Sequence, residues 1–349
     1  NKQNGIIEVT DADSVVLYIT AATSYQLQEN VFLRPNTAKF KGNVHPHSLI
    51  TNRIKEAVGK GYEFLRKEHI VDYQYFFNRV DLQLTDRIPA IPTDKLLSQY
   101  RSGKHDTYLE ELFFQYGRYL LIASSRNGSL PANLQGVWTQ YDFSPWSGGY
   151  WHNINIQMNY WHVFNTNLSE LFNPYMEYNE TFRKAGVQKA IDYITRHNPT
   201  ALNPINEENG WTIGTGATAF NIEAPGGHSG PGTGGFTTKL FWDYYDFTRD
   251  TQLLKEHVYP ALLGISKFLS KTLKEQPDGT LLVDPSFSPE QKHNKQYYRT
   301  KGCIFDQSMI LETYQDLLKA AKILNSRDPF LKTVKEQIGK LDAIKIGES

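Results

Sequence analysis

Two asparagines, Asn153 and Asn155, are separated by one residue in the segment HNINIQMNYWH. In an extended backbone, side chains at positions i and i+2 point to the same face, so this spacing predicts two neighbouring amides. Ile154 and Ile156 would then lie on the opposite face as an apolar anchor. The two amides either line a site or form a structural network that satisfies the backbone groups of a loop.

Glu290 is the second residue whose setting suits chemistry. It follows Ser288-Pro289 in the segment DPSFSPEQ, where two prolines stiffen the chain. A carboxyl group held in a stiff loop beside aromatic residues is suited to act as a general acid. The alternative is a solvated surface charge, which is the usual state of a glutamate in a loop.

Aromatic residues surround the asparagine segment and are frequent in the whole chain. Trp146 and Trp151 precede the asparagines, and Tyr160 and Trp161 follow them. The chain contains 21 Tyr, 19 Phe and 6 Trp, and flat side chains with a polar edge suit partly apolar ligands such as sugar rings. The composition therefore favours a ligand of this kind.

Three other motifs have weaker functional interpretations. The glycine-rich PGGHSGPGTGG at 225–235 lacks the preceding strand and the following Gly-Lys-Ser/Thr of a phosphate-binding loop, so we expect a flexible loop beside a cleft. His45 and His47 have no third ligand nearby, so we expect no metal site. Cys303 is the only cysteine, and before an apolar helix it is expected to be an inert buried thiol.

The charge balance excludes some classes of partner. Lys+Arg and Asp+Glu both number 37, so no net field attracts the chain to nucleic acid or to an anionic membrane. No apolar run approaches the roughly 18 residues of a membrane-spanning helix. Residues 1–30 lack the basic flank and apolar core of a signal peptide, so we expect a soluble chain from which any export signal has been removed.

The first part of the chain changes from a strand pattern to a helical one. Residues 6–25 are rich in β-branched residues and have a turn at Asp11–Asp13, which predicts two strands at the end of a β domain. Residues 47–69 have the pattern of one connecting helix. Pro89 and Pro92 then mark the entry to a second region.

After Asp106 the apolar residues recur at helical spacing, which predicts about seven helices. The loops between them, at 126–155, 198–236 and 276–306, are too long for simple connectors and are the expected place of a site. Such a series is typical of an α/α toroid, in which paired helices ring a central cleft. Six pairs do not fit in this length, so we expect that the far half of the toroid is absent.

Several long motifs, taken in order, resemble glycoside hydrolase family 95. They are GRYLLIASSRNGSLPANLQGVW (117–138), NINIQMNYW (153–161) followed by NLSEL (167–171), and SFSPE (286–290), with further similarity in FWDYYDFTRDTQLLKEHVYPALLG and FDQSMI. The similarity extends from about residue 70 onward, and the first 25 residues resemble the end of the family's N-terminal β domain. The resemblance implies a mainly α chain whose parts are 1–40, the end of the β domain; 41–88, a helical linker; and 89–349, the N-terminal part of an (α/α)6 catalytic barrel.

The resemblance also implies an activity. Members of the family are exo-acting, inverting α-L-fucosidases, chiefly on α-1,2 linkages, and related α-L-galactosidases. The family's general acid matches Glu290, and its water-positioning asparagines match Asn153 and Asn155. An amide cannot take up a full proton, so these residues would orient a water for a carboxylate base. In the family that base is an aspartate far downstream of the acid, and this chain ends before it, so we expect the chain alone to be catalytically incomplete.

The expected partner is a fucosylated oligosaccharide or glycan, bound outside the cell or in the periplasm without a cofactor or metal, and the fragment is expected to self-associate. We expect Trp151, His152 and Trp211 to bind substrate. Fucosidases of the family tend to have histidine at the position of Trp151, and an apolar indole there favours the C6 methyl of fucose over the hydroxyl of L-galactose. The alternatives are a non-catalytic carbohydrate-binding protein on the same scaffold and, more weakly, a sugar isomerase or epimerase.

Overall fold

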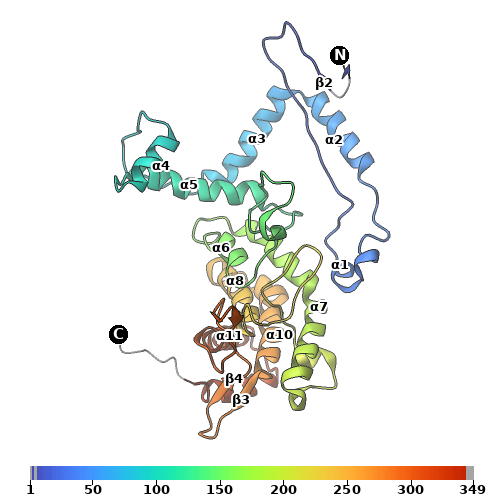
Figure 1. The fold of residues 1–349 in the computed structure, drawn as a ribbon, viewed down its shortest axis with the longest axis vertical. Coiled ribbons are helices and arrows are strands. Elements are labelled where there is room, and N and C mark those ends of the chain that lie inside the picture. Colours follow the sequence, from blue (N-terminus) through green and yellow to red (C-terminus); the bar gives the residue numbers. More distant parts are fainter. Residues whose placement is uncertain (1, 4–5, 343–349) are drawn as a thin grey trace. The chain divides into compact units, whose positions relative to one another are not determined.

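The structure, a computed structural model, describes residues 2–3 and 6–342 and is mainly helical (Figure 1). The prediction of a mainly α chain is therefore confirmed. The chain divides into two compact units, the first formed by 1–26 with 40–76 and the second by 27–39 with 77–349. These units do not follow the limits 1–40, 41–88 and 89–349, and the assignment of those limits as domains stays a prediction.

The first unit begins with very short strands. β1 (Lys2–Gln3) pairs antiparallel with β2 (Ile6–Ile7), and residues 8–28 have no regular secondary structure. The two strands predicted over 6–25 are thus formed only at Ile6–Ile7. The β-branched sequence favours an extended backbone, but a strand is stable only when a neighbour pairs with it, and in the described chain residues 8–25 have no such neighbour. Side chains such as Ile19, 86% exposed, remain uncovered.

Two helices complete the first unit, α2 (His47–Lys60) and α3 (Tyr62–Phe77). The prediction of one helix over 47–69 is wrong, because Gly61 between them has φ 77°, in the left-handed region that ends a helix. The Gly61 amide donates a hydrogen bond to the carbonyl of Ala57 at 3.1 Å, which closes the last turn of α2.

The short segment 27–39 belongs to the second unit although it precedes most of the first in sequence. It contains α1 (Glu29–Leu33). The Phe32 ring meets the Tyr178 ring edge-on, with centroids 5.8 Å apart. Lys39 is 4% exposed, and its Nζ donates hydrogen bonds to the carbonyls of Val31 and Phe220. These contacts fix the segment to the helical unit.

The second unit contains most of the helices. They are α4 (Thr93–Arg101), α5 (Thr107–Ser124), α6 (Asn155–Tyr160), α7 (Asn173–His197), α8 (Gly232–Thr248), α9 (Thr251–Leu253), α10 (Tyr259–Ser270), α11 (Ile304–Ile323) and α12 (Phe330–Ile338). Eight α-helices therefore begin after residue 106 in the described range, against about seven predicted, and one of them has only three residues. The closing of such helices into a toroid stays a prediction.

Two small hairpins interrupt this helical series. β3 (Leu273–Glu275) pairs antiparallel with β4 (Leu281–Val283), and β5 (Lys292–His293) pairs antiparallel with β6 (Gln296–Tyr297). Both lie between α10 and α11, within the long loop that the sequence predicts at 276–306 or at its edge. The second hairpin directly follows Glu290.

The core lies where α8, α10 and α11 pack against one another. Ile310, Tyr314 and Leu317 on α11 are fully buried, as their helical spacing predicts. α8 approaches closely because it begins with glycines: a Cβ at Gly234 would lie 2.2 Å from Ile265 Cδ1. Residues 229–235 of the glycine-rich segment are buried, and 232–235 form the start of α8, so the prediction of a flexible loop is wrong for this part of the segment.

The described chain shows neither a membrane span nor a metal cluster. None of its described helices is both long and apolar enough to cross a bilayer. Across residues 2–3 and 6–342, no three His, Cys, Asp or Glu side chains lie close enough together to hold a metal ion.

Candidate active site

The asparagine segment forms a turn that leads into a helix. Backbone hydrogen bonds tie Tyr150 N to Ala217 O at 2.9 Å and His152 N to Thr215 O at 2.8 Å, and α6 begins at Asn155. The predicted extended backbone is therefore wrong, since a period of two does not hold where the chain turns into a helix.

The side chains of this segment alternate differently from the prediction. Asn153 is only 7% exposed, whereas Ile154, the expected apolar anchor, is 40% exposed. Asn155 is half-buried at the first position of α6, and Ile156 is fully buried beneath it. The two amides thus have separate environments, and only one of them is buried.

Asn153 contacts Glu290, which is 137 positions away in sequence. The Asn153 Nδ2 group donates a hydrogen bond to Glu290 Oε1 at 3.0 Å. The structure thereby brings together two residues that were predicted separately as site residues. The Glu290 side chain is 47% exposed, so one side of its carboxyl group stays open to solvent or to a ligand.

His228 also lies near this carboxyl group, and Tyr297 contacts His228. His228 Nδ1 is 3.6 Å from Glu290 Oε1, and the Tyr297 hydroxyl is within hydrogen-bond distance, 2.8 Å, of the His228 ring. A Cβ at Gly227 would lie 2.6 Å from the Tyr297 ring, so glycine is needed for this close approach. Sequence reasoning missed both residues. The only local indication was a histidine inside a glycine-rich run.

The segment that carries Glu290 is held on both sides. Ser286 and Thr300 exchange two backbone hydrogen bonds of 2.9 Å, which closes the hairpin 286–300 at its base. Gly230 N donates to Phe287 O at 3.0 Å, which attaches the same hairpin to the glycine-rich segment. The general-acid candidate therefore stands on a hairpin with fixed ends.

His152 and Trp211, predicted to bind substrate, lie in the core. His152 is 1% exposed, its Nδ1 is 3.0 Å from Thr237 Oγ1, and its ring stacks on Tyr178 at 6.1 Å. Burial lowers the pKa of His152 to about 3, so the imidazole is neutral. Trp211 is 3% exposed, and its Nε1 donates to the carbonyl of Ala261 at 3.3 Å. These positions disfavour direct sugar contacts by either ring.

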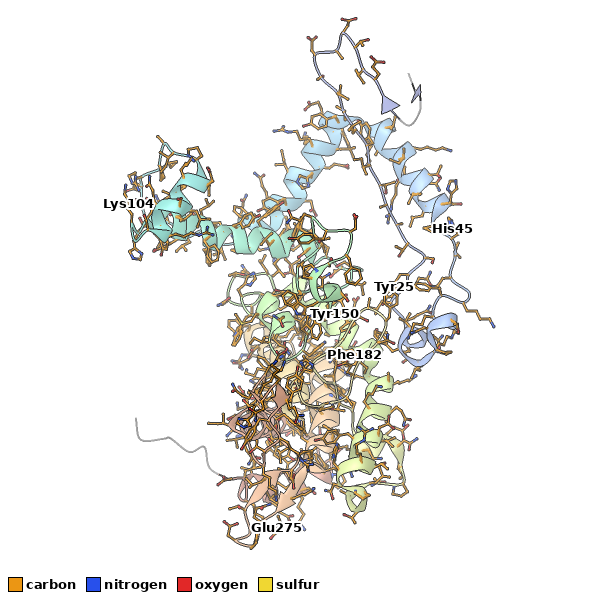
Figure 2. All side chains as sticks on the ribbon, in the orientation of Figure 1. Tyr25, His45, Lys104, Tyr150, Phe182 and Glu275 are labelled. Carbon is orange, nitrogen blue, oxygen red and sulfur yellow. The ribbon has the colours of Figure 1, made fainter. Side chains whose placement is uncertain are left out.

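An aromatic cluster packs beside the asparagine turn. The ring centroids of Tyr150 and Tyr178 are 4.7 Å apart, and those of Tyr178 and Phe182 are 5.2 Å apart. Tyr150 and Phe182 lie within the dense side chains of the second unit (Figure 2). These aromatic residues pack against one another in the core, so the aromatic content of the chain is not explained by ligand binding alone.

Trp151 is the one predicted substrate-binding residue that stays half-buried. Its backbone has φ 46°, an unusual left-handed conformation for a bulky residue. Its buried Nε1 has no hydrogen-bond partner in the described part of the chain. A strained backbone and an unpaired buried donor both cost free energy, and such features are often found at functional sites.

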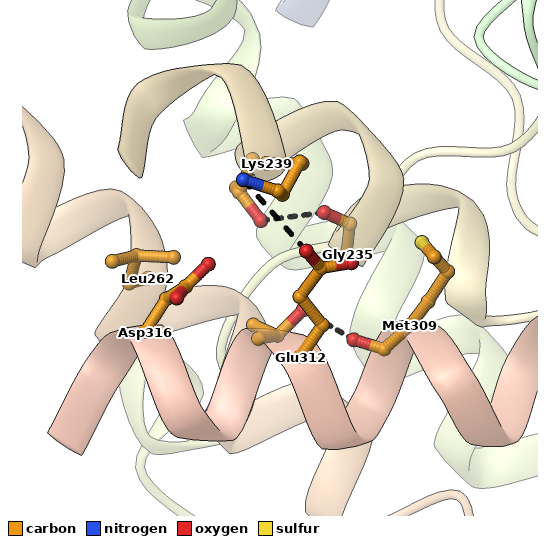
Figure 3. Close-up of a pocket in the computed structure, with 8 residues that line it drawn as sticks. Gly235, Lys239, Leu262, Met309, Glu312 and Asp316 are labelled. Carbon is orange, nitrogen blue, oxygen red and sulfur yellow. Dashed lines mark hydrogen bonds and ion pairs between the residues drawn. The ribbon is translucent and has the colours of Figure 1, made fainter. Parts of the chain in front are cut away.

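Cys303 and the charged cluster at Lys239 have structural explanations. Burial raises the pKa of the half-buried Cys303 thiol to about 11, so it is a poor nucleophile at neutral pH. A hollow between α8 and α11 is lined by Lys239, whose Nζ lies 3.7 Å from Glu312 Oε1 (Figure 3). Lys239 also pairs with Asp243. The hollow is too narrow to admit a water molecule, so it is no ligand site.

Comparison with known proteins gives one consistent family. A profile of the glycosyl hydrolase family 95 catalytic domain matches residues 61–349. "Probable alpha-fucosidase A" of Aspergillus niger is 36% identical over 321 residues, which cover 90% of this chain and 39% of that protein. "Alpha-L-fucosidase 2" of Arabidopsis thaliana is 30% identical over 341 residues, which cover 93% of this chain and 38% of that protein. The chain spans under two fifths of the length of these curated relatives.

Proposed function

Because the chain belongs to glycosyl hydrolase family 95, we propose that the full-length protein is an exo-acting, inverting glycoside hydrolase that releases α-linked L-fucose from fucosylated oligosaccharides or glycans. The names of its relatives support a fucoside substrate. Trp151, whose indole would face the C6 substituent, favours fucose over L-galactose. Since glycans of this kind are found on secreted and surface molecules, the proposed place of action is extracellular or periplasmic.

The observation that carries the proposal is the contact between Asn153 and Glu290. A half-exposed carboxyl group beside a buried amide donor, on a hairpin with fixed ends, is a suitable mount for a general acid. In the proposed mechanism Glu290 protonates the departing glycosidic oxygen. Asn153 and Asn155 orient the attacking water on the other face of the sugar, for a base that we assign to no residue of this chain.

The contact has a consequence for substrate binding. In an inverting hydrolase the acid and the base are roughly 6.5–9.5 Å apart, with the sugar and the water between them. If Asn153 acts on the water's side, the sugar must separate Asn153 from Glu290 and break their 3.0 Å hydrogen bond. We therefore propose that substrate entry replaces this hydrogen bond with contacts to the sugar.

The test is substitution of Glu290 in the full-length protein, with two substrates that differ in leaving group. Glu290→Gln should reduce hydrolysis of a fucosyl-α-1,2-galactoside by roughly 10²–10⁴-fold, because a sugar alkoxide leaves badly without a proton. Hydrolysis of a fucosyl fluoride of the correct anomer should be reduced much less, since fluoride leaves unaided. Glu207→Gln, which replaces an exposed glutamate elsewhere, is the matched control.

The outcomes separate the possibilities. Equal losses on both substrates would show that Glu290 binds or supports the loop and is not the acid. A wild-type protein that binds fucosylated glycans but turns over neither substrate would be the non-catalytic alternative, a carbohydrate-binding protein.

A further inference from the structure

We propose that Asp306 is a positioning residue that fixes the hairpin bearing Glu290 and thereby sets where the proton is delivered. This inference rests on the proposed role of Glu290 as general acid. Asp306 lies in the segment FDQSMI, and its residue type and position in the sequence predict no role for it.

The Asp306 side chain is fully buried, on the first turn of α11. Among the residues that the structure describes, no Lys, Arg or His pairs with it. An isolated carboxylate is costly to bury unless hydrogen-bond donors satisfy it. A buried Asp306 is therefore expected to accept several hydrogen bonds.

Four donors converge on this carboxyl group. Oδ1 accepts from Gly232 N at 2.7 Å, and Oδ2 accepts from Ser286 Oγ at 2.5 Å and from Phe287 N at 3.2 Å. The Cys303 thiol donates a weaker bond at 3.5 Å. Gly232 is the first residue of α8, so the starts of α8 and α11 both direct their positive ends toward the charge.

These bonds join three separate segments at one point. One oxygen holds the start of α8, and the other holds Ser286 and Phe287, at the base of the hairpin that carries Glu290. A Cβ at Gly230 would lie 2.1 Å from Asp306 Oδ2, so the glycine-rich segment also packs directly on the carboxyl group. The glycines there are explained by this contact and not by an anion ligand.

The position of Ser286 and Phe287 is transmitted to Glu290 through a short, stiff segment. Pro285 and Pro289 lie on either side of these residues and restrict φ, so little freedom separates the fixed base from the acid. A general acid must lie within hydrogen-bond reach of the departing oxygen, and a displacement of about 1 Å can cost roughly 10²-fold in rate. Loss of the Asp306 bonds should therefore act on catalysis through Glu290.

The principal variant is Asp306→Asn in the full-length protein. It keeps the shape of the side chain but puts an NH2 group where one oxygen accepted, so a donor faces a donor. We expect kcat on the fucosyl-galactoside to fall up to about 10²-fold with a much smaller change in KM. The fucosyl fluoride should be spared, as in Glu290→Gln, and the double variant should lose little beyond Glu290→Gln alone.

Two further variants keep the test decisive if Asp306→Asn does not fold. Ser286→Ala removes one donor and keeps the charge, so it should show a smaller loss with the same dependence on leaving group. Ser266→Ala is the matched control, because its hydroxyl is also fully buried but has no hydrogen-bond partner in the described chain. It should leave the ratio of the two substrates unchanged.

Hydrogen exchange of the 286–300 backbone amides gives a readout that does not depend on activity. Asp306→Asn and Ser286→Ala should accelerate exchange in this hairpin more than in α10. If the wild type hydrolyses no fucoside, the proposed function fails, yet faster exchange would still show that Asp306 holds the hairpin. Equal losses on both substrates, with exchange in the hairpin unchanged, would overturn the positioning role.

Discussion

Asn153, which donates a hydrogen bond to Glu290, and Asn155 are the residues proposed to position the attacking water. A positioned water contributes only as the transition state forms. Asn153→Ala and Asn155→Ala in the full-length protein should therefore lower kcat far more than they raise KM. Steady-state kinetics on the fucosyl-galactoside measures this split.

The control for the asparagine variants is Asn206→Ala, which changes an exposed amide away from Glu290. The two site variants also need not behave alike, because only Asn153 contacts Glu290. An unchanged kcat in both would return the asparagines to the alternative role of a structural network.

His152 gives a prediction about pH and stability. Burial lowers its pKa from 6.5 to about 3, so folding favours the neutral ring. The contribution of the neutral His152 ring to stability is fully present above pH 6.5, where the ring is neutral in both the folded and the unfolded protein. It is lost as the pH falls from 6.5 toward 3. The loss should reach about 2 kcal/mol at pH 5 and about 5 kcal/mol below pH 3.

Urea unfolding of the wild type and of His152→Gln between pH 8 and pH 5 measures this loss. The variant should be less stable at pH 8 but should lose less stability on acidification. His105→Gln, at an exposed position, should retain the slope of the wild type. Equal slopes for the wild type and His152→Gln would contradict the burial of a neutral imidazole.

Between elements, glycines decide how closely the segments of the second unit approach. Gly210 has φ 68°, and a Cβ there would lie 2.0 Å from the carbonyl oxygen of Gly264 on α10. Gly279, in the turn between β3 and β4, has φ 85° but open space around it. Both glycines have a positive φ, but only Gly210 would clash with a neighbour if it carried a Cβ. Comparing the two positions therefore separates the cost of the backbone conformation from the cost of the steric clash.

Alanine substitution of the two glycines should therefore have unequal effects. Gly279→Ala should cost about 1–2 kcal/mol in the free energy of unfolding, because only the left-handed conformation is penalised. Gly210→Ala should cost about 1–3 kcal/mol more, because a rigid backbone atom cannot move aside. Denaturant unfolding measures both values, and equal costs would contradict the close packing of this turn on α10.

Within the molecule as a whole, the second unit exposes large apolar side chains on and near α5. A cavity of about 400 Å³ is lined by residues of α5, by Trp138 and Met158, and by polar residues such as Asn159 and His162. Phe113, one turn before the lining residue Gly117 on α5, is 79% exposed. Exposed apolar side chains that lie near one another favour association.

The 349-residue chain should therefore self-associate as its concentration rises, with little dependence on salt. Phe113→Glu should shift the mass measured by light scattering toward the monomer, because a charge cannot be buried in an apolar contact. Ile205→Glu, at a position that is 60% exposed but away from this surface, is the control. A monomeric wild type at all concentrations would contradict the prediction.

The sequence by itself determined the features that depend on near neighbours along the chain. The helical spacing of Ile310, Tyr314 and Leu317 predicts a buried face, since 3.6-residue periodicity is a local property. Several long motifs taken in order indicated the family, and the motif SFSPE at 286–290 indicated Glu290 as the acid candidate. Local patterns failed at Gly61 and at residues 8–25, where one backbone angle and the absence of a pairing neighbour in the described chain outweighed them.

Only the tertiary structure decided which of these residues meet. Asn153 and Glu290 are 137 positions apart. His228, in the segment before α8, and Asp306, on α11, contact the same hairpin. His152 resembled a ligand-binding residue in sequence but lies in the core, because burial depends on packing by distant segments. A side chain's type limits what it can do, whereas its exposure and its partners are set by contacts between segments that no local pattern records.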